Sequence, residues 1–392
     1  MRCSWMRVAV PFLLALSLAC PKKPVEPVLA PAPTPAPQGQ PKTPAEQAVA
    51  LYDRGEYSPA RGILEELERQ GSLNGPLMYR LGFCYGYAGD EAKQREWMAR
   101  ALEALQQEAT TANSLEVSFF LANALTNTGQ TVAAARTAAE ATSLIETKQW
   151  PEPARALDRF RVAKLYADQG RGDEATRWYR AALQAFAAEG EPAPGYVRWA
   201  RRYLAQRAIA RGDSADAAEQ LAALVALGGA PAADYDRLAG ARVRLGQWSQ
   251  AAEAWAEAVR LDPANADRPR YCRNLALQAE TIRSLPAASP AGGSWASLSK
   301  EDLETLLREQ AAIARQIHKD AATTPPADAA ARANLERTLA TAQSTFVAAA
   351  LEYALRNYDI RETAFVGGYA PLIFHPEEWQ LPPASPPQGD QN

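Results

Sequence analysis

Apolar positions recur at three- and four-residue steps through most of the chain from residue 45 to residue 285, which is the period of an amphipathic helix. A glycine interrupts this pattern six times, at spacings of 34, 40, 41, 42 and 34 residues: Gly55, Gly89, Gly129, Gly170, Gly212 and Gly246. A recurrence at 34 to 42 residues predicts helix pairs joined by a tight turn, and pairs that recur in series predict a solenoid.

Alanine follows most of these glycines at a constant distance of five residues: Ala60, Ala134, Ala175, Ala217 and Ala251. Gln94 takes this position in the second copy. Two helices that cross closely need small residues at the crossing, and large residues then fill the space between successive pairs. A generic alanine-rich helical bundle is the alternative that this composition leaves open.

The copies resemble the tetratricopeptide repeat, whose pattern places Leu-Gly and Tyr in the first helix and Ala, an aromatic residue and Ala in the second. The second copy has Leu81-Gly82, Tyr85, Met98 and Ala101, and the sixth has Leu238-Ala239, Ala251, Trp255, Ala258 and Pro263. The resemblance covers about residues 44–285 and is weakest in the first copy. It implies an all-α superhelical solenoid of about six repeats (45–285), closed by a capping helix at 268–285. The longer spacings in the middle predict longer helices or loops.

A different pattern follows the repeats. Residues 286–298 contain Pro, Gly and Ser and are expected to be a linker. Residues 299–381 predict a long helical hairpin with its turn at 323–326, followed by an apolar stretch at 365–374. That stretch either packs back on the hairpin or binds a partner. Residues 382–392 are Pro-rich and are expected to be disordered.

The N-terminus predicts a signal peptide over residues 1–20. Arg2 and Arg7 precede an apolar run of 11 residues, which as a helix is about 16 Å long and too short for a bilayer core of roughly 30 Å. The sequence Leu16-Ser17-Leu18-Ala19-Cys20 resembles the bacterial lipobox, although the lipobox prefers Leu where Ser17 stands. The resemblance implies lipidation of Cys20 and, with Pro21 next, an outer-membrane destination. Ordinary cleavage near Ala19, which yields a periplasmic or secreted protein, is the alternative.

Residues 21–44 are rich in Pro and Ala and are predicted to form an extended linker of at most about 75 Å. Such a linker would hold the folded part away from the membrane surface.

The resemblance also implies a binding surface, because the first helices of tetratricopeptide repeats line a concave groove. The inward positions map here to aromatic, amide and cationic residues: Tyr79, Phe83, Tyr87, Phe119, Asn123, Asn127, Phe160, Lys164, Trp199, Arg202 and Gln206. Tyr, Trp and Arg are enriched among the residues that contribute most to protein interfaces. A peptide of an envelope protein is therefore the expected partner, although packing between repeats also explains several of the rings.

Two features of this groove concern the chemistry of a partner. Some repeats of this family bind a C-terminal carboxylate through Lys and Asn, but Phe119 stands where that clamp would need Lys. A cluster of arginines either binds an acidic peptide or is a solvated helix face: Arg198, Arg201, Arg202, Arg207 and Arg211.

The composition argues against several classes of protein and kinds of site. The net charge of −3 argues against a generally basic nucleic-acid-binding protein. Four Cys and two His in 392 residues predict neither a disulfide framework nor a histidine metal site, and Cys84 and Cys272 are expected to be buried thiols. The sequence has no Gly-rich phosphate loop and no nucleophile elbow, so no catalytic residue, metal or cofactor is predicted.

These observations predict a noncatalytic scaffold, lipid-anchored on the periplasmic side of the outer membrane, that assembles an envelope complex. Envelope lipoproteins with such repeats include secretin pilotins and accessory proteins of barrel assembly, polysaccharide export and gliding motility. One alternative is an envelope enzyme with its site in residues 299–381 and the repeats as a substrate-docking arm. The other is a secreted, unanchored adaptor.

Overall fold

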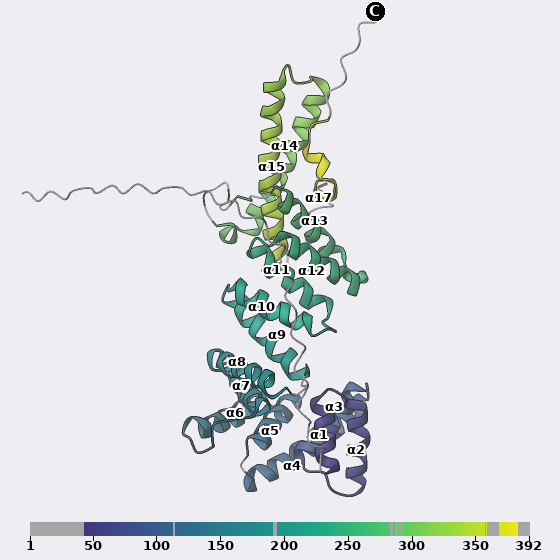
Figure 1. The fold of residues 1–392 in the computed structure, drawn as a ribbon, viewed down its shortest axis with the longest axis vertical. Coiled ribbons are helices and arrows are strands. Elements are labelled where there is room, and N and C mark those ends of the chain that lie inside the picture. The colour runs from purple at the N-terminus through teal and green to yellow at the C-terminus, as the bar shows by residue number, and fades with distance from the viewer. Residues whose placement is uncertain are drawn as a thin grey trace, which may run out of the picture. The chain divides into compact units, whose positions relative to one another are not determined.

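The computed structural model describes residues 43–112, 114–190, 194–282, 285–286, 289, 292, 294–356, 358 and 368–382. The predicted signal peptide with Cys20, almost all of the linker at 21–44 and the tail beyond 382 lie outside the described residues. Every regular element in the described residues is a helix (Figure 1), which confirms the predicted all-α fold.

Twelve helices form the six predicted pairs: α1 (Pro44–Asp53) with α2 (Tyr57–Arg69), α3 (Gly75–Tyr87) with α4 (Glu91–Thr111), α5 (Leu115–Asn127) with α6 (Thr131–Glu146), α7 (Ala156–Asp168) with α8 (Gly172–Glu189), α9 (Pro194–Ala210) with α10 (Ser214–Ala226), and α11 (Ala232–Arg244) with α12 (Trp248–Leu261). The second helix of each pair also packs on the first helix of the next. This stacking confirms the helical-repeat solenoid. The longer spacings arise partly from second helices, since α4 has 21 residues where α2 has 13.

The turn inside each pair depends on its glycine. Gly55 has a φ of +82° and Gly129 a φ of +78°, and the other four turn glycines also have positive φ. In the first pair the Gly55 N–H donates to the Tyr52 carbonyl and the Glu56 N–H to the Leu51 carbonyl, both at 2.9 Å. This hydrogen-bond pattern ends a helix with a left-handed residue, which glycine adopts without steric cost.

Small residues lie where the paired helices cross, as the sequence predicts. Ala60, Ala217 and Ala251 are fully buried at the crossing. In the second pair, a Cβ added to Gly82 would lie 3.0 Å from the Cβ of Trp97, so a larger residue would require a small shift of α4. The crossing residues thus set how closely each pair packs.

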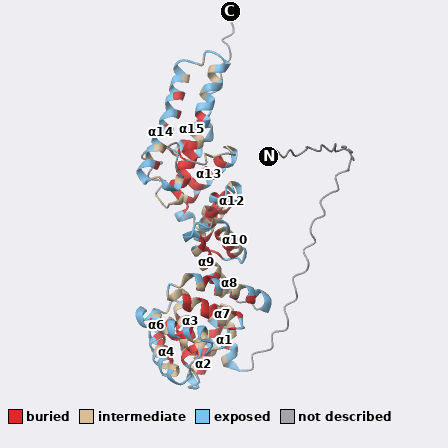
Figure 2. Ribbon diagram, turned by 90° about the vertical axis from the view of Figure 1, so that its left-hand side faces the viewer, coloured by how far each residue is buried: buried red, intermediate tan, exposed pale blue. Residues whose placement is uncertain are grey.

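The chain continues after the sixth pair with α13 (Asp267–Ile282), α14 (Lys300–Thr323) and α15 (Ala329–Leu355). Helices α14 and α15 pack together as the predicted hairpin. Helix α15 also runs antiparallel along α13, because Arg268 donates to the Ala354 carbonyl at 3.0 Å and Gln343 donates to Gln278 at 3.0 Å. Figure 2 shows that buried residues gather on the half of α15 nearest α13 and that the far end of the hairpin is exposed.

The described part of the last apolar stretch packs back on the hairpin and α13. It forms α17 (Ala370–Phe374) and a 3-10 turn, η3 (Pro376–Trp379). The buried Gln278 amide donates to the carbonyls of Leu372 and Ile373 at 2.9 Å each, and the Trp379 ring lies 5.3 Å from that of Phe346. Within the described ranges, no helix is long and apolar enough to cross a bilayer.

The turn glycines give a first prediction. Replacing Gly129 by Ala should lower the free energy of unfolding by about 1 kcal/mol, because alanine is strained at positive φ. An added Cβ at Gly129 meets nothing within 4 Å, so the loss would reflect backbone strain alone. The matched control is Gly62→Ala in α2, where the added Cβ also has open space and φ is not positive. That substitution should raise stability by about 0.5–1 kcal/mol. Denaturant unfolding followed by circular dichroism measures both, and a shift of the same sign in both variants would contradict the turn assignment.

Candidate functional site

The first and fifth repeats meet across the inner face of the solenoid. The Tyr196 hydroxyl in α9 donates to Oδ1 of Asp53 in α1 at 2.8 Å, although the two residues are 143 positions apart in sequence. The first helices of five successive pairs therefore surround a pocket, where the family resemblance implies an open groove.

This pocket is a cavity of about 220 Å³ whose walls are mainly aromatic. Its lining residues are Tyr52, Asp53, Tyr57, Tyr79, Phe83, Phe119, Phe120, Asn123, Phe160, Lys164, Gly195, Tyr196 and Trp199. Pockets for drug-sized ligands usually measure about 300–1,000 Å³. The cavity is thus suited to a single side chain or a small molecule.

Edge-to-face contacts hold the rings in place. Tyr52, Tyr57 and Phe83 form a triangle with centroid distances of 5.4, 5.5 and 5.3 Å. On the other wall, Phe160 lies 4.9 Å from Tyr196 and 5.7 Å from Trp199. Such pairs are worth about 0.5–1.5 kcal/mol each beyond the area they bury, so the walls are preorganised.

An ionic network lies behind the rings and joins three first helices. Arg80 of α3 and Arg161 of α7 each donate to the same oxygen of Glu116 in α5, both at 2.9 Å. Both arginine side chains are almost fully buried. Arg80 also lies 4.4 Å from the ring of Phe120 and 5.7 Å from that of Tyr52, so it supports two rings of the pocket.

The network sets the ionisation of Glu116. Burial acts to raise the pKa of this carboxyl group, but the charges of Arg161 and Arg80 outweigh burial and lower the pKa below its ordinary value. Glu116 is therefore ionised at neutral pH and balances two buried cations.

Two charged residues reach the pocket wall. Burial raises the pKa of Asp53, while the charge of Arg80 and the hydrogen bond from Tyr196 act in the opposite direction. Lys164 donates to both carboxylate oxygens of Asp168, at 2.7 and 2.8 Å, and its Nζ lies 5.8 Å from the Trp199 ring. The lysine charge is thus balanced within its own helix.

The structure brings most of the predicted groove residues together. Those that line the pocket are Tyr79, Phe83, Phe119, Asn123, Phe160, Lys164 and Trp199. The others lie off its wall. Tyr87 is 71% exposed beside Tyr57, Gln206 is exposed, and Asn127 donates to the Tyr79 hydroxyl at 3.0 Å.

Arg202 is used to join two repeats. Its guanidinium binds both oxygens of Asp234, at 3.2 and 2.6 Å, and the Asp234 side chain is fully buried. The other arginines of the predicted cluster likewise contact groups of neighbouring helices: Arg198 with Gly228, Arg201 with Gln220, Arg207 with Asp173, and Arg211 with Asp216. The cluster is therefore an inter-helix network rather than a free basic patch.

Sequence reasoning missed the contribution of the first pair. Tyr52 and Asp53 lie at the end of α1, where the repeat pattern is weakest, and they occupy the same repeat positions as Gly86 and Tyr87 of the second pair. A consistent extrapolation of the period would have found Asp53, the counterpart of Tyr87, but not Tyr52, whose counterpart Gly86 is not one of the predicted inward positions. Tyr57 and Tyr196 carried no such signal, because they lie outside the inward positions of a first helix.

The C-terminal end of α15 contacts the first helix of the sixth pair. A Cβ on Gly240 of α11 would lie 3.3 Å from Leu355 of α15, and Arg244 forms an ion pair with Glu352 at 3.5 Å. Gly240 and Arg244 are the counterparts of Phe83 and Tyr87 in the repeat period. The C-terminal end of α15 thus contacts α11 at two positions that correspond to predicted groove positions of the second pair.

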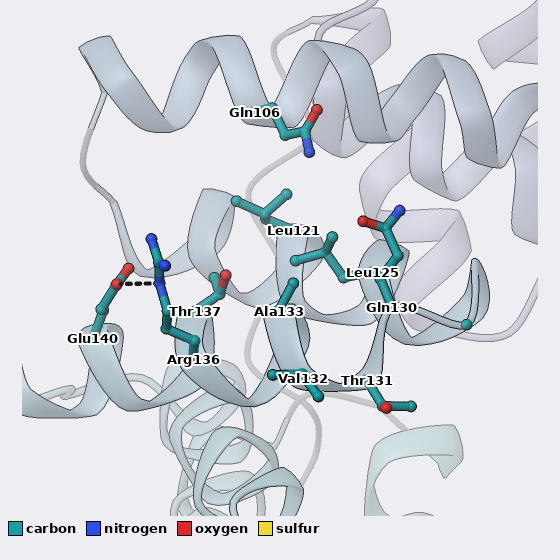
Figure 3. Close-up of a pocket in the computed structure, with 11 residues that line it drawn as sticks. Gln106, Leu121, Leu125, Gln130, Thr131, Val132, Ala133, Arg136, Thr137 and Glu140 are labelled. Carbon is teal, nitrogen blue, oxygen red and sulfur yellow. Dashed lines mark hydrogen bonds and ion pairs between the residues drawn. The ribbon is translucent and has the colours of Figure 1, made fainter.

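A second hollow, of about 710 Å³, is lined by residues of α4, α5 and α6 (Figure 3). Leu121 and Leu125 of α5 lie between Gln106 of α4 and the small side chains of α6, and Arg136 is paired with Glu140 at 3.0 Å. This wide hollow has no aromatic wall. The aromatic pocket is therefore the stronger candidate site.

The structure also places the residues considered for other chemistry. Cys84 and Cys272 are buried free thiols, and burial raises the pKa of each to about 12. Among the described residues, no group of three or more His, Cys, Asp or Glu side chains is arranged to hold a metal ion. His318 contacts the Glu378 carbonyl at 2.8 Å and so helps to hold η3 against the hairpin.

Comparisons with known proteins concern the fold. No protein-family model matches the chain, and neither does any curated protein. Among solved structures, the Cut9–Hcn1 hetero-tetramer of the APC/C aligns with a TM-score of 0.41 and 14% identity, over 76% of this chain and 50% of that chain. The present chain thus spans about half the length of that protein.

Two bacterial tetratricopeptide-repeat proteins align over more of their own length. One, from Thermus thermophilus, has a TM-score of 0.30 and 18% identity, over 51% of this chain and 97% of that chain. The other, from Parabacteroides merdae, has a TM-score of 0.31 and 17% identity, over 61% and 91%. The assignment of function therefore depends on the pocket of this chain.

The shared carboxylate gives a second prediction. Glu116→Gln should lower the free energy of unfolding at pH 7 by about 2–3 kcal/mol, because Arg80 loses its ion-pair partner and Arg161 keeps only its ion pair with Asp158. Because the pKa of Glu116 is lowered from 4.5, its contribution is present above that value and is lost as the pH falls through the lowered pKa. The gap between wild type and variant should therefore close in acid.

The matched control is Glu140→Gln, which alters an exposed pair and should change stability by less than about 0.5 kcal/mol. Thermal unfolding at several pH values measures both variants. Equal effects at the two sites would show that Glu116 does not hold the inner helices together.

Proposed function

We propose that this protein is a noncatalytic scaffold that binds a protein partner through the aromatic pocket and is held by a lipidated Cys20 at the periplasmic face of the outer membrane. The observation that carries the first half is the closed ring of five first helices around a preorganised aromatic cavity. Aromatic anchors in desolvated pockets contribute most of the energy of many protein interfaces.

The size of the pocket and its surroundings specify how a partner is held. A cavity of about 220 Å³ receives one side chain, and the Trp199 indole, 37% exposed, stays accessible for further contact. The remainder of the partner would then lie on surfaces outside the cavity. This mode differs from a long peptide laid along an open groove.

The proposal of an anchor rests on the sequence. The positive residues, the short apolar run and the cysteine that ends it are typical of a lipoprotein signal, and the Pro-rich stretch that follows is suited to a spacer. An envelope complex is the partner class that such an anchor favours: a pilotin-like, barrel-assembly, polysaccharide-export or gliding-motility assembly.

Partner capture tests the scaffold proposal. Tagged protein is recovered from detergent-solubilised envelopes, and co-purified proteins are quantified by mass spectrometry. The double variant Phe83→Ala, Trp199→Ala should reduce specific partners at least about tenfold, since each truncated anchor removes more than about 1 kcal/mol of binding. The control is the double variant Gln106→Ala, Val132→Ala in the second hollow, which should retain the specific partners. If both variants recover the same partners in the same amounts, the pocket does not bind the partner.

Fractionation tests the anchor separately. Wild-type protein should sediment with outer membranes, and mass spectrometry of the mature N-terminus should show acyl chains on Cys20. Cys20→Ser should stop this processing, so that the variant lacks the acylated N-terminus. An unmodified mature N-terminus in the wild type would instead indicate the periplasmic or secreted adaptor.

A further inference from the structure

One acidic side chain stands in the aromatic wall of the pocket. Oδ1 of Asp53 accepts the hydrogen bond from Tyr196, and within the described part of the chain no cationic group lies within 4.0 Å of its carboxylate. Arg80 acts on Asp53 through its charge, but its own hydrogen bonds go to Glu116 and to the Pro76 carbonyl. The carboxylate therefore lines the cavity without a direct ion-pair partner.

An ionised aspartate at position 53 is unfavourable for the stability of the folded protein. Its pKa is raised by burial, so folding disfavours the ionised form and the residue lowers stability at neutral pH. An asparagine would accept the Tyr196 hydrogen bond without this penalty. Residues that oppose stability in a cavity are typical of binding sites.

The rings around Asp53 favour positive charge. Aromatic faces attract cations, most strongly where water is excluded. The chain already shows this behaviour, since Arg80 lies over Phe120 from behind the wall and Lys164 lies near Trp199. Lys164 does not repel a second cation strongly, because both oxygens of Asp168 bind it.

We propose that the pocket binds a basic side chain, lysine or arginine, of a protein partner. The cationic group would lie beside Asp53 and the aliphatic part against Phe83, Phe119 and Trp199. This inference rests on the proposed function, because it names the chemistry of the partner residue that enters the same pocket.

Other occupants fit less well. A neutral apolar side chain would fill the same volume, but it would displace water from the Asp53 carboxylate without forming a hydrogen bond or ion pair to replace it. An acidic side chain would meet both the carboxylate and the negative ring faces. A basic side chain replaces the lost water with an ion pair and keeps its aliphatic part on apolar surface.

A pair of matched compounds tests the inference on the full-length protein. N-acetyl-lysine amide and N-acetyl-norleucine amide share an aliphatic side chain, but only the first carries an ammonium group. Chemical-shift titration of the tryptophan indole N–H signals, with Trp199→Phe to assign the reporter, gives the two dissociation constants. The wild type should bind the lysine compound about tenfold more tightly than the norleucine compound.

Asp53→Asn is the variant that isolates the charge, since its amide oxygen still accepts from Tyr196. It should remove the preference for lysine by weakening lysine binding, should not weaken norleucine binding, and should melt no lower than the wild type at neutral pH. Val132→Ala in the second hollow should change the affinity for neither compound. Equal binding of the two compounds by the wild type, an unchanged lysine preference in Asp53→Asn, or no binding of either compound would each overturn the inference.

These results separate the inference from the scaffold proposal. Lysine-selective binding combined with partner capture that is independent of Phe83 and Trp199 would leave the pocket chemistry standing and reject the pocket as the scaffold's binding site. Partner capture that depends on Phe83 and Trp199, without selectivity for lysine, would support the pocket as the scaffold's binding site and reject the basic side chain as its occupant.

Discussion

The inner face of this protein depends on one carboxylate that is shared by two buried guanidinium groups. Glu116 of α5 accepts from Arg80 of α3 and Arg161 of α7, so three successive repeats are joined on the side that faces the pocket. Glu116 offsets the cost of burying both guanidinium groups, and Asp158 adds a second ion pair to Arg161 at 2.9 Å. The same contact therefore fixes the spacing of the first helices and the positions of the rings in front of them.

Closure of the pocket follows from this spacing together with the stacking of the pairs. No helix pair buries its own apolar face, so each pair must pack on the next. With the inner helices drawn together, α9 comes within hydrogen-bond reach of α1, and Tyr196 meets Asp53. Nine of the lining residues are aromatic, and their mutual edge contacts resist collapse of the cavity.

The sequence predicts the local features well because their causes are local. A glycine five residues before an alanine specifies a left-handed turn and a close crossing, and the structure has both, for example at Gly55 and Ala60. The inward positions of the first helices follow from the same period. The sequence therefore predicts Phe83, Phe119 and Phe160, and all three line the pocket.

The remaining features depend on distances that a repeat pattern does not carry. Whether the inner face is open or closed depends on small angles between pairs, summed over 143 residues, and these angles respond to the lengths of α4, α6 and α8. The pairing of Tyr196 with Asp53 has for that reason no signature in the sequence. The same holds for α15, whose contact with Gly240 joins residues 115 positions apart.

The two ends of the inner surface therefore differ in a way that bears on recognition. At the sixth pair, glycine at position 240 makes room for Leu355, and the ion pair of Arg244 with Glu352 holds α15 there. At the second pair, Phe83 stands at the position that corresponds to Gly240 and lines the aromatic pocket. A residue that accommodates the chain's own helix at one end is thus replaced by a ring at the other, and that ring lines the pocket to which we assign partner binding.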